Sequence, residues 1–187
     1  MTSDAGRPAV FFDRDGTLME DVDYCGNPAD VRVFPGAPAA LRRLKDAGFR
    51  LVIITNQSGI GRGYFTEETY RSVDAELRRQ IGSDLIDASY HCSHLPDDGC
   101  ACRKPSPQML FDAAREHRLD LAHSFFVGDK LSDVECGRAA GVRTVLVKTG
   151  YGNSVDESRP DLVAPDLQHA ADLILKAHET TPSCRTK

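Results

Sequence analysis

The 187-residue sequence has no long hydrophobic run and no excess of positive charge. No stretch approaches the roughly 18 consecutive apolar residues that a membrane-spanning helix needs, so we expect no membrane partner. Lysine and arginine total 23 against 28 aspartates and glutamates, and the net charge of -5 argues against nucleic acid as a partner. The apolar stretch near the N-terminus is too short for a secretory signal. We therefore expect a cytoplasmic protein.

Internal repeats and low-complexity segments are also missing from the sequence. A chain of this length, with 41% hydrophobic residues, can bury a core without disulfide bonds. We expect one domain over residues 1–179 and a flexible tail at 180–187. No apolar seam calls for a dimer, so a monomer is expected. Because thiols stay reduced in the cytoplasm, the six cysteines are interpreted as metal ligands or core residues.

Short apolar segments alternate with amphipathic ones, a pattern typical of a parallel sheet covered by helices. Four segments are apolar on both faces, as buried parallel strands are: residues 9–12, 51–54, 124–127 and 144–147. Weaker strand candidates surround Tyr90 and Leu162. Helices are predicted over 37–47, from Thr66 onward, over 107–117, after Asp129, and over 166–177. The sequence thus predicts an α/β doubly wound parallel sheet with helices on both faces.

Residues at the predicted helix ends support these assignments. Gly48 is well suited to follow the end of the first helix, and Thr66 is a suitable N-cap for the second. Ser132 and Glu135 are spaced as a capping box for the helix after Asp129.

Doubly wound sheets bind ligands beyond the carboxyl ends of their strands, so the polar residues there are the candidates for chemistry. The first strand is followed by Asp13-Arg14-Asp15-Gly16-Thr17, which alone is equally typical of a polar turn. A calcium loop is a poorer match, because further acidic ligands are missing. After the second strand, Thr55 and Asn56 open a segment that could cradle a phosphate or form a plain turn.

The remaining strand exits supply cations and further acids. Arg103 and Lys104 precede Pro105, an arrangement that by itself is typical of a solvated surface pair. Asp129 and Lys130 follow the strand at 124–127, and Asp133 comes one helical turn later. Asp13 and Asp129 could hold a hard cation, and their oxygen ligands favour Mg²⁺.

Taken together and in this order, the four motifs resemble the haloacid dehalogenase superfamily of phosphotransferases, from about residue 10 to residue 147. The resemblance implies a magnesium-dependent phosphatase that acts on a small phosphorylated metabolite through an aspartyl-phosphate on Asp13. It also implies that the backbone carbonyl of Asp15 completes the magnesium ligands. The Asp15 carboxyl would protonate the leaving oxygen and then deprotonate the attacking water.

The same resemblance implies roles for the other polar residues at the strand exits. Thr55, Asn56 and Lys104 would hold the phosphoryl oxygens. Asp133 is expected to orient Lys130 or a metal-bound water rather than to bind the metal itself.

A cluster of soft metal ligands lies in the loop 92–102, ahead of Arg103. Cys92, His94, Cys100 and Cys102 form a set suited to a closed tetrahedral Zn²⁺ site. A disulfide and chance clustering are the alternatives. Such a site would tie down a polar loop and aim Arg103 and Lys104 at the substrate. The neighbouring His91 is expected to face away from the cluster.

Within the superfamily, this loop and the run at 58–66 resemble the group of heptose bisphosphate and histidinol-phosphate phosphatases. The run Ser-Gly-Ile-x-Arg-Gly-x-Phe-Thr and Lys130 favour the heptose enzymes, whereas the short gap between His94 and Cys100 favours the histidinol enzymes. No large cap domain is expected, so specificity is assigned to the loops 19–27, 58–65 and 92–102. Arg62, Arg103 and Lys130 are candidates to bind the substrate, and the alternative for Arg62 is that it is merely solvated.

Two other functional classes fit parts of the pattern. A receiver-like phosphoacceptor domain also carries an aspartate at a strand end with Mg²⁺, but it needs neither Asp15 nor the cysteine loop. A zinc-stabilised binding module without activity is disfavoured, because each catalytic position holds a competent residue. Cys25, Cys136 and Cys184 are given no function.

Overall fold

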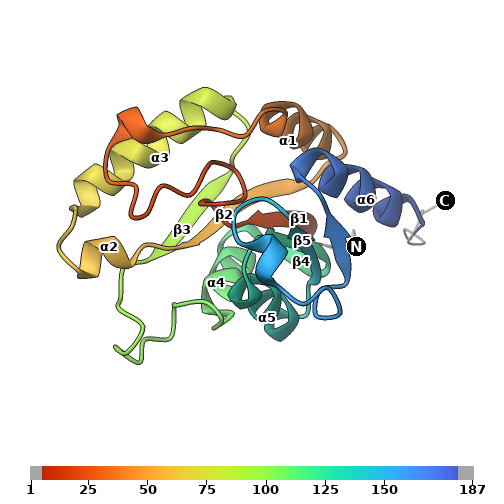
Figure 1. Cartoon of the computed structure of the whole chain (residues 1–187). Coiled ribbons are helices and arrows are strands. Elements are labelled where there is room, and N and C mark those ends of the chain that lie inside the picture. Colours follow the sequence, from red (N-terminus) through yellow and green to blue (C-terminus); the bar gives the residue numbers. More distant parts are fainter. Residues whose placement is uncertain (1–5, 181–187) are drawn as a thin grey trace.

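A six-stranded parallel sheet forms the centre of the protein, as seen in the computed structural model, which describes residues 6–180 (Figure 1). The strand order is β3-β2-β1-β4-β5-β6, and all paired neighbours are parallel. The strands are β1 Arg7–Phe12, β2 Arg50–Asn56, β3 Ala88–Cys92, β4 Leu119–Gly128, β5 Arg143–Val147 and β6 Leu162–Ala164. Cys184 and the predicted tail beyond residue 180 lie outside the described residues.

The side chains of each strand point alternately to the two faces of the sheet, and this divides the hydrophobic core into two layers. In β1, Val10 and Phe12 belong to one hydrophobic cluster, and Ala9 and Phe11 belong to the other. The same period of two residues recurs in β2, because successive side chains of a strand point to opposite faces. Both faces are therefore apolar and buried, which is why the strand segments read as continuous hydrophobic runs.

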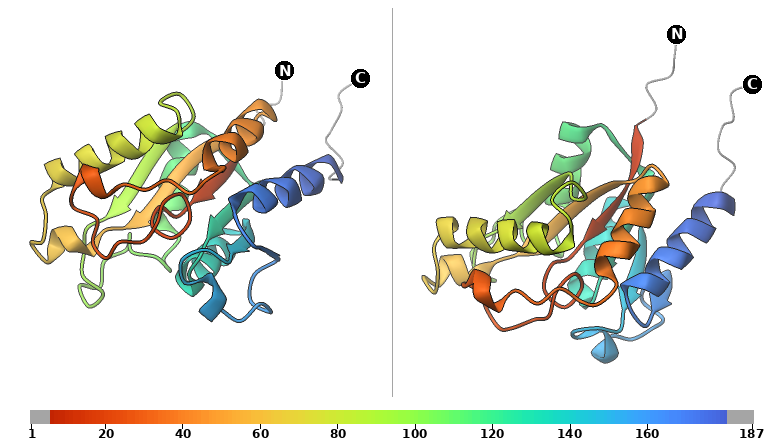
Figure 2. Two further views of the ribbon diagram at one scale, coloured as in Figure 1. Left: turned by 45° about the horizontal axis from the view of Figure 1, so that its top comes forward. Right: turned by 90° about the horizontal axis from the view of Figure 1, so that it is seen from above.

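Helices cover both faces of the sheet, as Figure 2 shows. Three of them pack on the face of Val10 and Phe12: α1 Ala37–Asp46, α3 Glu67–Ile81 and α6 Leu167–Thr180. The opposite face is covered by α4 Gln108–His117 and α5 Leu131–Ala140. The predicted fold class is thereby confirmed. None of the helices described in residues 6–180 combines the length and apolar character needed to span a membrane.

Several helix ends match the sequence prediction, and one does not. The Thr66 hydroxyl accepts a bond from the Thr69 N–H, so Thr66 is the N-cap of α3 as predicted. The capping box predicted at Ser132 and Glu135 is wrong, because α5 begins earlier, at Leu131. Its N-terminus is instead closed by Asp133, whose Oδ2 accepts a bond of 3.0 Å from the Lys130 N–H.

The carboxyl ends of the strands share one edge of the sheet, and β1 lies between β2 and β4. This is the switch point where parallel α/β sheets place their ligands. Between β1 and α1, the described chain forms only isolated bridges and the short helix η1 Pro28–Asp30, so no large cap interrupts it there. A further helical turn, α2 Ser58–Gly61, follows β2 inside the segment predicted as a loop.

Candidate active site

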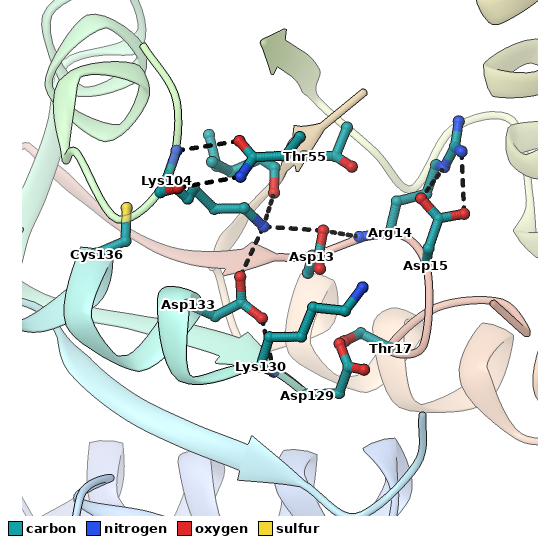
Figure 3. A network of polar contacts seen from close by, with 12 residues as sticks. Asp13, Arg14, Asp15, Thr17, Thr55, Lys104, Asp129, Lys130, Asp133 and Cys136 are labelled. Carbon is teal, nitrogen blue, oxygen red and sulfur yellow. Dashed lines mark hydrogen bonds and ion pairs between the residues drawn. The ribbon is translucent and has the colours of Figure 1, made fainter. Parts of the chain in front are cut away.

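The side chain of Lys104 is the hub of the polar cluster at this edge (Figure 3). It is 3% exposed, and its Nζ lies 2.9 Å from Asp13 Oδ1 and 2.7 Å from Asp133 Oδ1. The same ammonium group donates to the Ile54 carbonyl at 2.9 Å. Burial lowers the pKa of Lys104, but the charges of Asp13 and Asp133 outweigh it and raise the pKa above its ordinary value. The lysine therefore stays charged.

Asp13 sits directly at the end of β1 and is almost completely buried. Its Oδ1 also accepts a bond of 2.8 Å from the Arg14 N–H. Burial opposes ionisation, but the charges of Lys104 and Lys130 outweigh it, and the pKa of Asp13 falls below its ordinary value. Asp13 is thus held as a carboxylate, the form required of a nucleophile.

Asp129 follows β4 and occupies a niche built from glycines and main-chain donors. The Tyr151 N–H donates to its Oδ2 at 2.9 Å, and the Thr17 hydroxyl lies 3.3 Å from its Oδ1. Gly16 has a φ of +83°, and a Cβ built there would lie 2.3 Å from Asp129 Oδ2. A Cβ on Gly150 would lie 2.2 Å from the same oxygen. Only residues without side chains let the loops approach this carboxylate so closely.

Asp13, Asp129 and Asp133 form a candidate cation site. Each is buried, and one oxygen from each lies within 4.8 Å of the others. Burial, followed by the charge of Asp13, raises the pKa of Asp129 to about 7. A divalent cation would relieve the electrostatic repulsion between these closely packed carboxylates, and the all-oxygen donor set fits Mg²⁺. The candidate group differs from the predicted set in containing Asp133, one of whose oxygens already contacts Lys104.

The carboxylate of Asp15 is held by Arg14 and Gln57. Arg14 Nε and Nη2 donate to its two oxygens at 3.0 Å each, and Gln57 Nε2 donates to Oδ2 at 2.9 Å. Gln57 Nε2 also donates to the Thr55 hydroxyl at 2.9 Å. The predicted proton-transfer residue is therefore linked by hydrogen bonds to the predicted phosphate-binding residue Thr55. No described contact tests the predicted role of the Asp15 carbonyl, which stays a prediction.

The side-chain amide of Asn56 binds the backbone of Lys104. Its Oδ1 accepts from the Lys104 N–H at 3.0 Å, and its Nδ2 donates to the Lys104 carbonyl at 3.1 Å. The amide thus places Lys104 beside Asp13, a positioning role that differs from the predicted contact with a phosphoryl group.

A pocket of about 350 Å³ opens beside these residues. It is mixed in charge, with acids from the loop 19–27 facing the cations Arg103 and Lys130. Lys130 Nζ pairs with Asp21 at 3.1 Å across this pocket. Its lining residues are Asp15, Asp21, Asp23, Tyr24, Cys25, Asn56, Gln57, Ser58, Gly59, Arg103, Lys130, Ser132 and Tyr151.

Arg62 is not part of this lining in the described structure. Its guanidinium lies 5.8 Å from the centre of the Tyr24 ring, on the loop that borders the pocket. The alternative that Arg62 is a surface residue therefore has the better structural support.

The four soft ligands of the loop 92–102 converge as predicted. The three sulfurs are 3.1–3.7 Å apart, and His94 Nδ1 lies 3.3 Å from Cys102 and 3.5 Å from Cys92. A tetrahedral zinc site with Zn–S bonds of about 2.3 Å needs neighbouring sulfurs roughly 3.8 Å apart. A disulfide needs about 2.05 Å, which these distances exclude. The donor set fits Zn²⁺, and the sulfur distances of 3.6 and 3.7 Å are close to this spacing, whereas the 3.1 Å between Cys92 and Cys102 is shorter.

His91 points to the other side of its strand, as expected. Its Nε2 contacts the carboxylate of Glu67 at 3.0 Å, and its ring packs on Tyr70 with centres 4.1 Å apart. It takes no part in the metal-ligand cluster.

Some residues of the site were not singled out from the sequence. They are Arg14, Gln57, Thr17 and the Thr149–Tyr151 segment after β5. The last group could have been found, because it follows a predicted strand and obeys the same rule that identified Asp129. The contacts of Arg14 and Gln57 depend on side-chain direction, which the motif does not contain.

Comparison with known families defines the class of this protein. Residues 10–95 match the family model of haloacid dehalogenase-like hydrolases, and residues 101–170 match a HAD-hydrolase-like model. The curated D-glycero-beta-D-manno-heptose-1,7-bisphosphate 7-phosphatase of Haemophilus ducreyi is 39% identical over 173 residues, which cover 87% of this chain and 95% of the relative. The D-glycero-D-manno-heptose-1,7-bisphosphate 7-phosphatase of Thermosynechococcus vestitus is 38% identical over 187 residues, which cover 90% of this chain and 95% of the relative.

A solved structure agrees with these relatives. The D,D-heptose 1,7-bisphosphate phosphatase of B. bronchiseptica, complexed with magnesium and phosphate, superposes with a TM-score of 0.83 and 36% identity. The match covers 91% of this chain and 99% of that one. The chain belongs to the haloacid dehalogenase-like hydrolases and, within them, to the family of the D-glycero-D-manno-heptose 1,7-bisphosphate 7-phosphatases. The prediction of a phosphatase of this superfamily, a class that uses Mg²⁺, is confirmed.

A first prediction concerns Asp129 and the cation. The pKa of this group is raised from 3.8 to about 7, so the folded protein loses stability as the pH rises between these two values, and the full loss applies above pH 7. At pH 8 without metal, Asp129→Asn should melt at a higher temperature than the wild type. Added Mg²⁺ should raise the Tm of the wild type and of the exposed control Asp46→Asn, but not that of Asp129→Asn. An equal rise in all three proteins would contradict the site.

A second prediction concerns the cysteine cluster. Burial, and then the hydrogen bond with Cys102, raise the pKa of Cys92 to about 12, so without a cation this thiol stays protonated. We expect purified protein to release one equivalent of zinc when its thiols are blocked. Cys100→Ser should lose that zinc and unfold at a lower temperature, whereas Cys25→Ser, outside the cluster, should keep it. Equal zinc content in both variants would rule out this site.

Proposed function

We propose that this phosphatase removes the 7-phosphate of D-glycero-D-manno-heptose 1,7-bisphosphate. The substrate assignment rests on curated relatives that are named for this activity. They are 38–39% identical to this chain, and the match covers 95% of their length. The buried cluster around Asp13 supports the chemistry. A cytoplasmic location and a monomeric state stay predictions.

The proposed reaction has two halves. Asp13 attacks phosphorus, the bond to the sugar oxygen breaks, and Asp15 gives its proton to that oxygen. Water then attacks the aspartyl-phosphate, Asp15 takes a proton from the water, and phosphate leaves while Asp13 is restored. Asp13, Asp129 and the Asp15 carbonyl would hold Mg²⁺, which would supply positive charge that offsets the repulsion between the carboxylate and the phosphate. Lys104 and Thr55 stabilise the phosphoryl oxygens.

Cations around the pocket suit a substrate with two phosphates. Lys104 lies beside Asp13, where the scissile phosphate reacts, and Arg103 and Lys130 line the adjoining pocket. Arg103 follows the zinc loop directly, and its Nη1 bonds to the His94 carbonyl at 3.2 Å. A structural Zn²⁺ at Cys92, His94, Cys100 and Cys102 would therefore fix the position of this arginine.

Mutations can distinguish the roles of Asp13 and Asp15. Asp13→Asn should abolish turnover, since an amide is no nucleophile. Asp15→Asn should fold normally and turn over about 10²–10⁴-fold more slowly, the usual share of acid–base catalysis. Steady-state phosphate release with Mg²⁺ measures both. Substantial turnover by Asp13→Asn would refute the covalent route.

A substrate panel tests the specificity. Asp23 lines the same pocket and would suit the ammonium group of histidinol phosphate, so that ester is the second candidate. We expect a large preference in kcat/KM for the heptose bisphosphate over histidinol phosphate. Arg103→Ala should reduce kcat/KM for the bisphosphate more than for a monophosphate of similar size. The opposite preference would assign the protein to histidinol phosphate.

A further inference from the structure

Arg14, which separates the two aspartates of the first motif, is a buried arginine at the edge of the reaction site. Its side chain is 0% exposed, although its neighbour Asp15 borders the open pocket. A buried guanidinium is strongly disfavoured unless it is paired with an anion and well hydrogen-bonded. Such a residue beside a nucleophile therefore calls for a specific explanation.

The ion pair that the structure describes for Arg14 is with Asp15. Nε and Nη2 contact the two carboxylate oxygens at 3.0 Å each, in the bidentate geometry that fixes the plane of a carboxylate. On its other side the guanidinium lies over the Tyr70 ring, 5.6 Å from the ring centre. Among the described residues its Nη1 finds no hydrogen-bond partner, so its polar contacts are concentrated on the Asp15 side.

Gln57 completes the frame around Asp15. Its Oε1 accepts from Arg14 Nη2 at 3.1 Å, and its Nε2 donates to Asp15 Oδ2 at 2.9 Å. The same Nε2 reaches the Thr55 hydroxyl at 2.9 Å. Gln57 is only 4% exposed and follows the end of β2. It therefore ties the carboxylate to a second strand of the sheet, so that Asp15 is not positioned by its own flexible turn alone.

We propose that Arg14 and Gln57 are positioning residues that fix the Asp15 carboxyl for proton transfer. This inference rests on the proposed function, in which Asp15 protonates the leaving oxygen as the phosphorus–oxygen bond breaks. The carboxylate that remains is the form that Arg14 and Gln57 hold, ready to take the proton of the attacking water. A proton donor must lie within hydrogen-bond reach of its target, and a misplacement of about 1 Å can slow a reaction about 10²-fold.

The test uses two phosphate esters with leaving groups of different basicity, assayed with Mg²⁺. p-Nitrophenolate leaves with little need of a proton, whereas phenolate leaves much more readily when it is protonated. The readout is the ratio of kcat/KM for p-nitrophenyl phosphate to kcat/KM for phenyl phosphate. A loss of active enzyme lowers both constants equally and leaves this ratio unchanged. A displaced proton donor raises it.

Arg14→Lys is the main variant, because it keeps the buried charge and removes the bidentate fork. We expect it to raise the ratio roughly tenfold or more, in the same direction as Asp15→Asn. The matched control is Arg42→Lys, which breaks a bidentate pair with Asp84 on the surface and should leave the ratio at the wild-type value. If Arg14→Lys does not fold, Gln57→Leu decides, since it removes the bond to Asp15 without removing a charge.

The outcomes separate the two levels of the proposal. A raised ratio in Asp15→Asn together with wild-type ratios in Arg14→Lys and Gln57→Leu would overturn the positioning role alone. An unchanged ratio in Asp15→Asn would overturn the proton-transfer role of Asp15 and, with it, this inference. Raised ratios in Asp15→Asn and in either Arg14→Lys or Gln57→Leu, with an unchanged Arg42→Lys, would support it.

Discussion

The charge balance inside the carboxyl edge of the sheet is the constraint on which this site depends. Asp13, Asp129 and Asp133 are buried within reach of one another, and the ammonium groups of Lys104 and Lys130 face them. Lys130 also pairs with Asp21, so the carboxylates outnumber the ammonium groups and the cluster carries excess negative charge. A divalent cation would offset that excess and remove the repulsion that a phosphate ester would otherwise meet. The arrangement therefore favours metal and substrate binding together.

The position of Lys104 links this balance to the cysteine loop. Asn56 binds the Lys104 backbone from the end of β2, and Cys102 lies two residues before it. Cys92 is the last residue of β3, so a metal held by Cys92 and Cys102 would join the strand to the segment that carries the lysine. The polar loop between them has little apolar surface to bury. A metal bound there would supply the stability that packing does not.

Much of the fold could be predicted from the sequence because its strands are apolar on both faces. Residues 51–54 and 144–147 lie inside observed strands for this reason, and their polar successors reach the functional edge. Boundaries were less predictable. The strand predicted at 124–127 in fact extends over Leu119–Gly128. Its first half was not predicted because it is partly exposed and carries polar residues. The observed start of α5 differs from the predicted one because Asp133, which belongs to the buried cluster, caps the helix through the Lys130 N–H.

The candidate site was predictable at the level of which segments meet, and less so at the level of side-chain direction. Asn56 and Thr55 leave the same strand, yet the Asn56 amide turns to the Lys104 backbone while the Thr55 hydroxyl bonds to Gln57. Arg14 was overlooked because an arginine between two aspartates suggests an exposed residue. Its complete burial depends on Gln57 and Tyr70, which lie more than 40 positions away in the sequence.

The central claim, that Asp13 becomes covalently phosphorylated, is tested most directly by trapping the enzyme during turnover. With p-nitrophenyl phosphate, whose leaving group needs little protonation, Asp15→Asn should slow hydrolysis of the aspartyl-phosphate more than its formation, so the intermediate accumulates. Acid quenching and peptide mass spectrometry can then locate the added phosphoryl group. We expect this group on the peptide that contains β1 and Asp13, and we expect it to be absent in Asp13→Asn. A phosphoryl group on another residue, or turnover with no phosphorylated peptide, would rule out Asp13 as the nucleophile.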